Sequence, residues 1–501
     1  MFDRDLPLTP ALPRLSNATL ERLPPQIRRP AYDRAAVTPG IVHLGVGAFH
    51  RAHQAAYVDD VLGSGDRGWG IVAASLRSPE TRDALGPQDG LYALAVRSAE
   101  TETLRVVGAI QRVLVAPENP AALLAAMADA RTRIVTLTIT EKGYCHDPAT
   151  GELNEDHPDI RADLAKPRSP RSAIGFLAEA LRLRRAAGTL PFTVLTCDNL
   201  PANGHTVRRV VARHASMLDA DFGAFVSGEV AFPSTMVDRI VPATTQADRD
   251  RVSHGLGLTD AWPVITEPFS QWVIEDRFTL GRPGLEACGA VLVADVAPYE
   301  TMKLRLLNGS HSTLAYLGYL AGHETIAAAM ADAPFAALVA NLMDQETGPT
   351  LSLPAGVDVE SYKRSLIERF RNKALRHRTW QIAMDGSQKL PQRLLAAARE
   401  RIAEAAPIPR IALGVAAWMR YVTGIDEKDA PIDVRDPLAE RLRALSDTAG
   451  RDAERLSGAL LGVREVFGDD LARNERFAAP VTTALSLLLR AGAKEAVRLT
   501  A

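Results

Sequence analysis

Short apolar runs alternate with helix-like periodicity along the first two fifths of the chain. Runs rich in Val, Ile and Thr are typical of buried strands, and we expect such strands at 41–46, 69–76, 133–140 and 192–200. The segment 172–188 instead spaces its apolar residues as an amphipathic helix does, and it ends on glycine. Since strands that alternate with helices pair in parallel, this part predicts a doubly wound, Rossmann-type α/β sheet.

Beyond residue 296 the pattern changes to long segments that are rich in Ala and Leu and favour helices. The predicted helices cover 301–322, 325–345, 360–371, 391–405, 410–421, 436–447, 451–464 and 480–494. A chain of 501 residues is too long for one ordinary hydrophobic core. We therefore predict an α/β domain over residues 1–295 and a mainly α-helical domain over 296–501.

Composition and charge exclude several classes of partner. The chain is 47% hydrophobic and 24% charged, and its net charge of −2 gives no general attraction to nucleic acid or to an anionic membrane. No apolar run is long enough to cross a bilayer, and the start, MFDRDLPLTP, lacks the apolar core of a secretory signal. The three cysteines are far apart and form neither a disulfide framework nor a zinc pattern. We expect a reduced, cytoplasmic protein.

The stretch GVGAFH places Gly45 and Gly47 where the first predicted strand passes into a helical pattern. Glycines at this point let the pyrophosphate of a dinucleotide approach the backbone. The expected cofactor contacts are Gly45, Val46, Gly47, Ala48 and Phe49. The third glycine of the usual pattern is replaced by His50, and a plain tight turn would use the same two glycines.

The second predicted strand is followed by residues of both charges. An acidic side chain there would hold the adenine ribose hydroxyls of NAD, and Glu80 is the candidate, whereas Arg77 could accept the 2′-phosphate of NADP. Near the glycine turn, His50 and His53 are spaced as metal ligands can be, but no cysteine pair, HExxH motif or carboxylate cluster accompanies them. We interpret both histidines as packing residues and predict no metal site.

The stretch PYETMKLRLLNGSHSTLAYLGYL (298–320) is predicted to be a core helix, yet it carries Lys303, Asn308 and His311. At about 100° per residue, Asn308 falls about 140° and His311 about 80° from Lys303, so the three share one arc. Burial lowers the pKa of a lysine from about 10.4 toward 7–8, which suits a general base, and amides can donate to a charged oxygen. This set suits hydride transfer from an alcohol. The alternative is an exposed lysine on an amphipathic helix.

Three other segments carry candidate polar residues. Asp198 and Asn199 lie at the carboxyl end of the strand predicted within 192–200, where α/β sheets bind ligands, although an Asx turn explains this composition equally well. Asp238 lies between apolar residues, where a functional role and a structural one, a salt bridge with Arg239 or a helix cap, are equally compatible with the pattern. Gln381 and Lys389 flank a Gly-Ser turn and would matter if that turn faced the helix of Lys303.

Most of the candidate residues belong to longer sequence runs that are distributed over most of the chain. They are IVHLGVGAFHRAHQA, LTITEKGYC, TCDNLPANGH, DRIVPATT, EPFSQWVIED, GRPGLE, PYETMKLRLLNGSHSTLAYLGYL and MDGSQKLPQR, in this order across residues 41–393. Together they resemble the polyol-specific long-chain dehydrogenases, the family of mannitol 2-dehydrogenase and fructuronate reductase. Such a resemblance implies a metal-independent, NAD-dependent secondary-alcohol dehydrogenase that acts on a sugar acid or polyol as a monomer or small homo-oligomer.

The resemblance also implies a role for each matching position. Lys303 would be the general base, Asn199 and Asn308 would hold the reacting oxygen, and His311 would bind substrate hydroxyls. The remaining substrate contacts would be Asp238, Gln381 and Lys389. Glu300 matches a position linked to proton passage between the base and solvent.

The identity of residue 381 bears on the substrate. Mannitol-type members usually carry an arginine where this chain has Gln381, and the run HRTWQIAMDGSQKLPQR is similar to the fructuronate reductase branch. The runs LRSPETR and DAWPVITEPF are instead similar to mannitol-type members. Glutamine brings no charge to a substrate carboxylate, so Lys389, Arg376 or Arg378 would have to supply the cation. The resemblance implies D-fructuronate/D-mannonate as substrate pair, with mannitol/fructose as the alternative.

Overall fold

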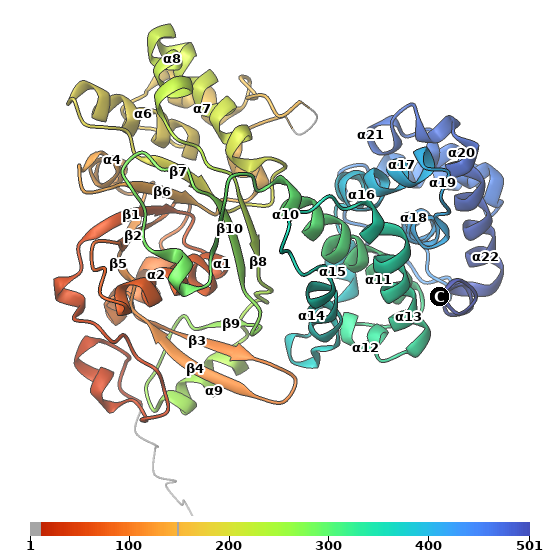
Figure 1. The fold of residues 1–501 in the computed structure, drawn as a ribbon, viewed down its shortest axis with the longest axis horizontal. Coiled ribbons are helices and arrows are strands. Elements are labelled where there is room, and N and C mark those ends of the chain that lie inside the picture. The colour runs from red at the N-terminus through yellow and green to blue at the C-terminus, as the bar shows by residue number, and fades with distance from the viewer. Residues whose placement is uncertain (1–11, 148–149) are drawn as a thin grey trace, which may run out of the picture. The chain divides into compact units, whose positions relative to one another are not determined.

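A computed structural model describes residues 12–147 and 150–501 of the chain (Figure 1). The start MFDRDLPLTP, which bears on the expected location in the cell, lies outside the described residues. Contacts divide the chain into two units after Val296.

The first unit is built around a five-stranded parallel sheet with the strand order β5-β2-β1-β6-β7. The strands are β1 (Pro39–Leu44), β2 (Gly70–Ser75), β5 (Ile110–Val115), β6 (Ile134–Leu137) and β7 (Thr193–Thr196). The strand order reverses direction at β1, as in doubly wound folds that bind ligands at this point. The predicted Rossmann-type sheet is confirmed, and the one strand that the apolar pattern missed is β5.

Alternate residues of each strand enter different hydrophobic cores. On β1, Val42 and Leu44 pack into one core and Ile41 into the other, because successive side chains of a strand point to opposite faces. Figure 1 shows helices on both sides of the sheet. Residues of α4 (Pro120–Ala128), α5 (Pro158–Ala165), α6 (Ala173–Ala186), α7 (Asn203–Leu218) and α8 (Ala220–Glu229) join the first core, and α1 (Ala48–Ala52) and α2 (Gln54–Gly63) join the second.

Two three-stranded sheets extend the first unit beyond the predicted parallel sheet. One has the order β4-β3-β9, and the other β11-β10-β8. Their strands are β3 (Tyr92–Arg97), β4 (Glu102–Val107), β8 (Thr235–Asp238), β9 (Val264–Thr266), β10 (Gln271–Glu275) and β11 (Val291–Val293). β8, β9, β10 and β11 are short and β4 is half exposed, so they lack the long apolar run by which buried strands are recognised. β3 does carry such a run, YALAV, but it was not among the predicted strands.

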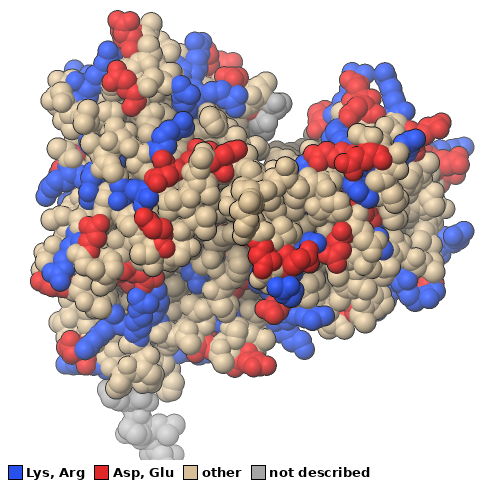
Figure 2. Space-filling model, in the orientation of Figure 1, with Lys and Arg blue, Asp and Glu red and all other residues tan. Residues whose placement is uncertain are grey.

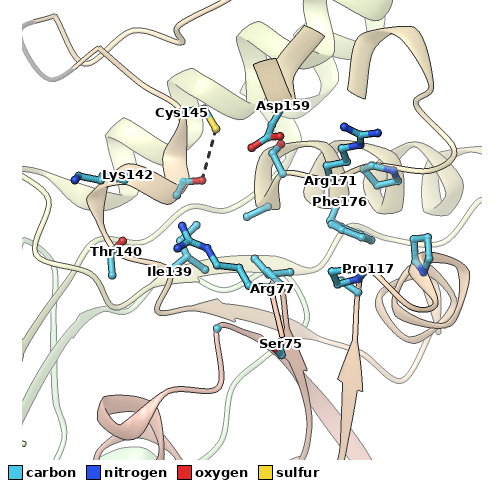
Figure 3. A pocket seen from close by; sticks show the side chains of 18 of the residues that line it. Ser75, Arg77, Pro117, Ile139, Thr140, Lys142, Cys145, Asp159, Arg171 and Phe176 are labelled. Carbon is cyan, nitrogen blue, oxygen red and sulfur yellow. Dashed lines mark hydrogen bonds between the residues drawn. The ribbon is translucent and has the colours of Figure 1, made fainter. Parts of the chain in front are cut away.

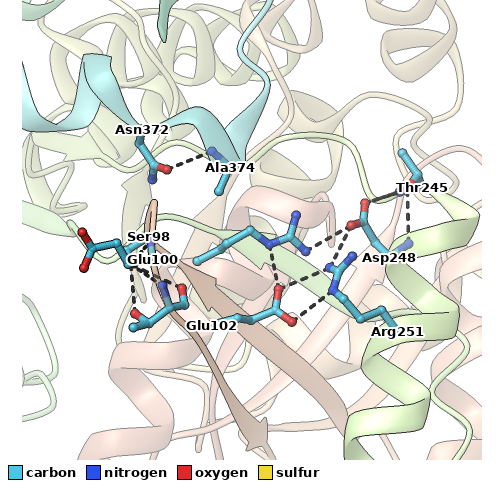
Figure 4. Close-up of polar contacts among 10 residues, drawn as sticks. Ser98, Glu100, Glu102, Thr245, Asp248, Arg251, Asn372 and Ala374 are labelled. Atoms are coloured by element: carbon cyan, nitrogen blue, oxygen red, sulfur yellow. Dashed lines mark hydrogen bonds and ion pairs between the residues drawn. The ribbon is translucent and has the colours of Figure 1, made fainter.

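Ion pairs connect the β3–β4 hairpin to α9 (Gln246–Leu256), as Figure 4 shows. Arg97 lies 2.7 Å from Glu102 and 3.1 Å from Asp248. Arg251 of α9 lies 3.1 Å from Glu102 and 2.8 Å from Asp248. Two arginines and two carboxylates therefore alternate, which holds the helix against the hairpin better than one exposed pair would.

The second unit is mainly helical, as predicted. Its helices are α10 (Ala297–Met302), α11 (Gly309–Leu320), α12 (Ile326–Met330), α13 (Ala333–Asn341), α14 (Val359–Arg371), α15 (Thr379–Ala383), α16 (Gly386–Leu390), α17 (Ala396–Ala403), α18 (Pro409–Tyr421), α19 (Ala439–Ala449), α20 (Ala453–Leu461), α21 (Arg464–Phe467) and α22 (Glu475–Thr500). The prediction of a single helix over 325–345 is wrong, because the structure has two helices there, α12 and α13. Pro334 lies in the first turn of α13, where proline is favoured. Proline has no backbone N–H, so it cannot donate the hydrogen bond that would continue α12.

The stretch that carries the predicted base is not one continuous α-helix. Between α10 and α11, residues Lys303–Asn308 form a π-helical segment, η6. Its hydrogen bonds run from residue i to i+5, so each residue turns the chain by less than in an α-helix, and the predicted angles do not hold across η6. Such segments are often found at functional sites. Nearly all of α11 is buried, against α15 and α18 among other helices.

The charged surface has no dominant sign. Figure 2 shows acidic and basic side chains interspersed over the face in view, in keeping with a net charge of −2. Within residues 12–147 and 150–501, the structure has no helix that is both long and apolar enough to cross a membrane.

Candidate functional site

A pocket of about 800 Å³ lies in the first unit at the carboxyl ends of β1, β2 and β6. Its wall includes the glycine turn after β1, Ser75 at the end of β2, Arg77 beyond it, and the segment 138–145 after β6. Figure 3 shows Ser75, Arg77 and side chains of the segment 138–145. We call this last segment the pocket wall 138–145. Ligands of doubly wound sheets bind at this edge, beside the strand where the order reverses.

The glycine turn leaves room that a side chain would fill. Gly45 has φ +94°, and a Cβ there would lie 2.1 Å from the carbonyl oxygen of Thr138. Gly47 is exposed and lines the pocket, and the nearest atom to a Cβ there is the carbonyl oxygen of Gly45 at 3.9 Å. The backbone at Gly47 is thus open to a ligand as bulky as a pyrophosphate, so the residues present fit a dinucleotide. Val46 also lines the pocket, whereas Ala48 and Phe49 lie on α1.

Basic side chains outnumber acidic ones along the pocket. Arg77, Lys142 and Arg171 line it, with Asp159 as the acid (Figure 3). Glu80 is exposed at the start of α3 (Glu80–Leu85), where it accepts a hydrogen bond from the Ser78 hydroxyl at 3.3 Å, and it is not among the lining residues. The lining therefore offers positive charge for phosphate groups.

The histidines near the glycine turn are packed together. His43 stacks on His50 with ring centroids 3.4 Å apart, and its Nε2 lies 3.1 Å from the Gly45 carbonyl oxygen. Burial lowers the pKa of His43 to about 3. His53 is buried as well, with Nε2 2.9 Å from the Gln271 carbonyl oxygen. These contacts fit the packing interpretation, and the described residues contain no group of three metal-ligating side chains.

Asn199 is exposed in the bend that follows β7, and Asp238 is the buried last residue of β8. Their strands are joined through Asn203. Its amide donates to the Asp198 carbonyl oxygen at 3.1 Å and to the Thr235 carbonyl oxygen at 2.9 Å, and its Oδ1 accepts from the Thr235 amide at 2.9 Å. The structure thereby connects the segments that carry these two predicted residues.

In the second unit, Lys303, Asn308 and His311 lie on η6 and α11. Lys303 and His311 are buried and Asn308 is half-buried. The His311 ring lies 4.7 Å from the Phe370 ring and 4.9 Å from the His377 ring. Burial, with His377 and two arginines nearby, lowers the pKa of His311 well below its usual range, so the ring is neutral at physiological pH.

Two arginines beside His311 were missed by sequence reasoning. They are Arg369 of α14 and Arg393 of the π-helical segment Pro391–Leu395, and both lower the pKa of His311. Arg393 donates to the Ser312 hydroxyl at 3.0 Å and to the Asn308 carbonyl oxygen at 3.5 Å. Gly309 permits this approach, since a Cβ there would lie 2.8 Å from the Arg393 carbonyl oxygen. The available sequence signal was helical spacing, because Arg393 follows Lys389 by four residues.

The other predicted residues of the second unit lie on short helices or their ends. Gln381 is exposed on α15, which packs against α11. Lys389 of α16 donates to the Met384 carbonyl oxygen at 2.5 Å and lies 3.9 Å from the Asp385 carboxylate. Glu300 is half-buried on α10, one turn before Lys303.

Comparison with known proteins agrees with this two-part architecture. Residues 39–287 match the family model of the mannitol dehydrogenase Rossmann domain, and residues 295–489 match that of the mannitol dehydrogenase C-terminal domain. The chain belongs to the mannitol dehydrogenase family. It is therefore an oxidoreductase of this family.

Proteins named for a sugar acid and proteins named for a polyol are both similar to this chain. D-mannonate oxidoreductase of Escherichia coli (strain K12) is 48% identical over 477 residues, covering 94% of this chain and 97% of that protein. Mannitol 2-dehydrogenase of Aspergillus fumigatus is 41% identical over 475 residues, covering 93% and 94%. The solved Pseudomonas fluorescens mannitol 2-dehydrogenase, a ternary complex with NAD and D-mannitol, has a TM-score of 0.87 and 39% identity, covering 97% and 99%.

Proposed function

We propose that this oxidoreductase interconverts D-fructuronate and D-mannonate with NAD as its cofactor. The observation that carries the proposal is the surroundings of His311. Its Nε2 is buried and has no hydrogen-bond partner among the described residues, and Arg369 and Arg393 are close enough to lower its pKa. A sugar acid offers hydroxyls to the imidazole and a carboxylate to a guanidinium, whereas a polyol offers hydroxyls alone.

The glycine turn supports the cofactor assignment. Gly45 and Gly47 would lie against the pyrophosphate, and Glu80 remains our candidate for the adenine ribose hydroxyls, with Arg77 as the residue that would favour a 2′-phosphate instead. Bound NAD supplies the carrier that accepts hydride from the alcohol or returns it to the ketone. The family resemblance and the solved relative that contains NAD both support this choice.

The chain's own residues would handle the proton and the oxygen. Lys303 would take the proton from the substrate hydroxyl, and the Asn199 and Asn308 amides would donate hydrogen bonds to the oxygen as it gains charge. We assign His311 to substrate hydroxyls and Glu300 to proton exchange between the base and solvent. Further substrate contacts are assigned to Asp238, Gln381 and Lys389. None of these roles calls for a metal ion.

Mannitol 2-dehydrogenase activity is the second candidate. It is supported by the solved relative that contains D-mannitol, which aligns over almost the whole chain. Under this alternative, Arg393 would only support the helix through Ser312 and Asn308, and its charge would not contribute to selectivity.

The deciding experiment compares NADH oxidation with D-fructuronate and with D-fructose. We expect kcat/KM to favour D-fructuronate strongly. We expect Arg393→Met to lower kcat/KM for D-fructuronate by roughly 10–100-fold, since a hydrogen bond to a charged group contributes about 1.5–3 kcal/mol. Activity with D-fructose should change far less.

Arg399→Met is the matched control. Arg399 lies on α17, the helix that directly follows the segment of Arg393, and it pairs with Asp470 on the surface at 2.6 Å. It should leave both activities near those of the wild type. A preference for D-fructose, with Arg393→Met affecting both substrates equally, would assign the protein to the mannitol branch. NADH binding without turnover of either substrate would instead indicate a binding protein that keeps the fold.

A further inference from the structure

The carboxylate of Asp198 accepts three hydrogen bonds from the pocket wall 138–145. Its Oδ2 accepts hydrogen bonds from the Ile139 amide at 2.8 Å and from the Tyr144 hydroxyl at 2.7 Å, and its Oδ1 accepts from the Thr140 amide at 3.1 Å. Ile139 and Thr140 line the pocket, as Figure 3 shows, and Asp198 does not. One side chain therefore fixes two consecutive peptide groups that face the cofactor pocket.

The backbone that it holds is strained. Thr140 has φ +63° and ψ +163°, a region that is occupied almost only by glycine. A β-branched residue stays in such a conformation only when surrounding bonds impose it. Hydrogen bonds hold the backbone on both sides of Thr140: its amide donates to Asp198 at 3.1 Å, and its carbonyl oxygen accepts from the Gly143 amide at 3.0 Å.

Asp198 is also connected to the segments that carry predicted substrate residues. It directly precedes Asn199, and its carbonyl oxygen accepts from the Asn203 amide, which in turn bonds both backbone groups of Thr235 at the start of β8. Its side chain and main chain thus join the cofactor pocket to the turn of Asn199 and to the strand that ends at Asp238. All these groups lie in the first unit.

We infer that Asp198 is a positioning residue, which keeps the pocket wall 138–145 in its strained, cofactor-accepting shape and fixes Asn199 relative to it. This inference rests on the proposed NAD-dependent function. Asp198 does not line the pocket, so it acts through Ile139 and Thr140.

If Asp198 positions the wall, the affinity for NADH should depend on the protonation of its carboxylate. A purely structural role would not produce this pH dependence. Burial raises the pKa of Asp198 to about 6, and the neutral acid is a weaker acceptor for the two amides. The titratable groups that face it are Glu141 and Tyr144 on the wall and Cys197 directly after β7; burial keeps Tyr144 and Cys197 neutral by raising the pKa of each. The affinity for NADH should therefore weaken as the pH falls below about 6.

The test is a fluorescence titration of NADH binding to the full chain at pH 7.5 and across pH 5.5–8. In Asp198→Asn, the side-chain NH2 group would face the backbone N–H of Ile139 or Thr140, and two donors cannot bond each other. We therefore expect the Kd for NADH to rise at least tenfold. Because asparagine does not titrate, the pH dependence of the Kd should also be lost. Thr140→Gly in that background should recover much of the affinity, because glycine adopts the same φ without strain. Tyr144→Phe should give a smaller rise, and Glu141→Gln should leave the pH dependence in place.

Asp260→Asn is the matched control. Asp260 is buried in the same unit and also accepts three hydrogen bonds, from Gln88, Ala93 and Trp262, but it is not part of the pocket. It should leave the Kd for NADH within about twofold of the wild type. Equal effects of Asp198→Asn and Asp260→Asn, or wild-type Kd values in both Asp198→Asn and Tyr144→Phe, would overturn the inference.

The two proposals fail in different ways. If the wild type binds NADH but turns over neither D-fructuronate nor D-fructose, the proposed substrate is wrong, while the Kd values still decide the role of Asp198. If Asp198→Asn does not fold, Tyr144→Phe and the wild-type pH profile decide it, and a flat profile with an unchanged Tyr144→Phe overturns it. A wild type that does not bind NADH overturns both proposals.

Discussion

Two alanine substitutions two residues apart should separate the folding role of the glycine turn from its binding role. In Gly45→Ala the new Cβ would lie 2.1 Å from the Thr138 carbonyl oxygen and 2.8 Å from its carbonyl carbon, at φ +94°. An L-residue in a sparsely populated conformation costs about 1–3 kcal/mol, and forcing apart packed backbone costs a further 1–3 kcal/mol or so. We expect Gly45→Ala to lower the free energy of unfolding by about 2–6 kcal/mol.

In Gly47→Ala the added atom meets no clash. Gly47 has φ −79° and ψ −174°, which any residue adopts, and its Cβ would be 3.9 Å from the nearest atom. The loss of glycine's freedom in the unfolded chain should raise stability slightly, by about 0.4–1 kcal/mol. The methyl group would, however, stand where a pyrophosphate approaches the backbone, so we expect the Kd for NADH to rise by at least tenfold.

Thermal unfolding and NADH titration measure the two effects side by side. Each kcal/mol corresponds to roughly 2–4 °C for a unit of this size, so Gly45→Ala should lower the transition of the first unit by on the order of 10 °C. Gly47→Ala should not lower it. Wild-type affinity in Gly47→Ala would refute the assignment of the pyrophosphate to this turn. An unchanged transition in Gly45→Ala would refute the geometry of its contact with Thr138.

Two further predictions concern the base and the buried histidines. Lys303→Ala should lower kcat by roughly 10²–10⁴-fold while the Kd for NADH stays within about twofold, and full activity in this variant would contradict the role of Lys303. Burial lowers the pKa of His43 to about 3, against about 6.5 in the unfolded chain, so the unfolded state binds its proton first as the pH falls. The free energy of unfolding should therefore fall with pH below about 6.5, with a contribution from His43 of about 3 kcal/mol by pH 4.5. His43→Gln should flatten the pH dependence of the unfolding temperature between pH 7 and pH 4.5, and an unchanged slope would show that this residue does not cause it.

The pattern of apolar residues along the chain was enough to predict the strands that are buried on both faces over their whole length. The strands around Val42, Val135 and Val194 are apolar on both faces because helices cover both sides of a parallel sheet, and such runs are recognisable without a structure. The glycine turn could be recognised as two glycines where a strand passes into a helix, although a plain tight turn uses the same two glycines.

Pattern failed where a conformation depends on distant partners. Residues 303–307 of the π-helical segment all favour helices, and nothing in their order distinguishes a π-helix from an α-helix. The short strands of the two smaller sheets are stabilised by pairing across the chain, as when β8 pairs with β10, rather than by their own composition.

The amino-acid sequence by itself indicated four of the five strands of the parallel sheet, the change from an α/β part to a helical part, and the residue types available for hydride-transfer chemistry. Only the tertiary structure decided which of those residues meet. Arg393 reaches Asn308 and Ser312 across 85 and 81 positions of the chain, and Asp198 reaches Ile139 and Thr140 across 59 and 58. Hydrogen bonds and charge act over a few ångströms in space, whatever the separation in sequence, so these contacts become visible only when the chain is folded.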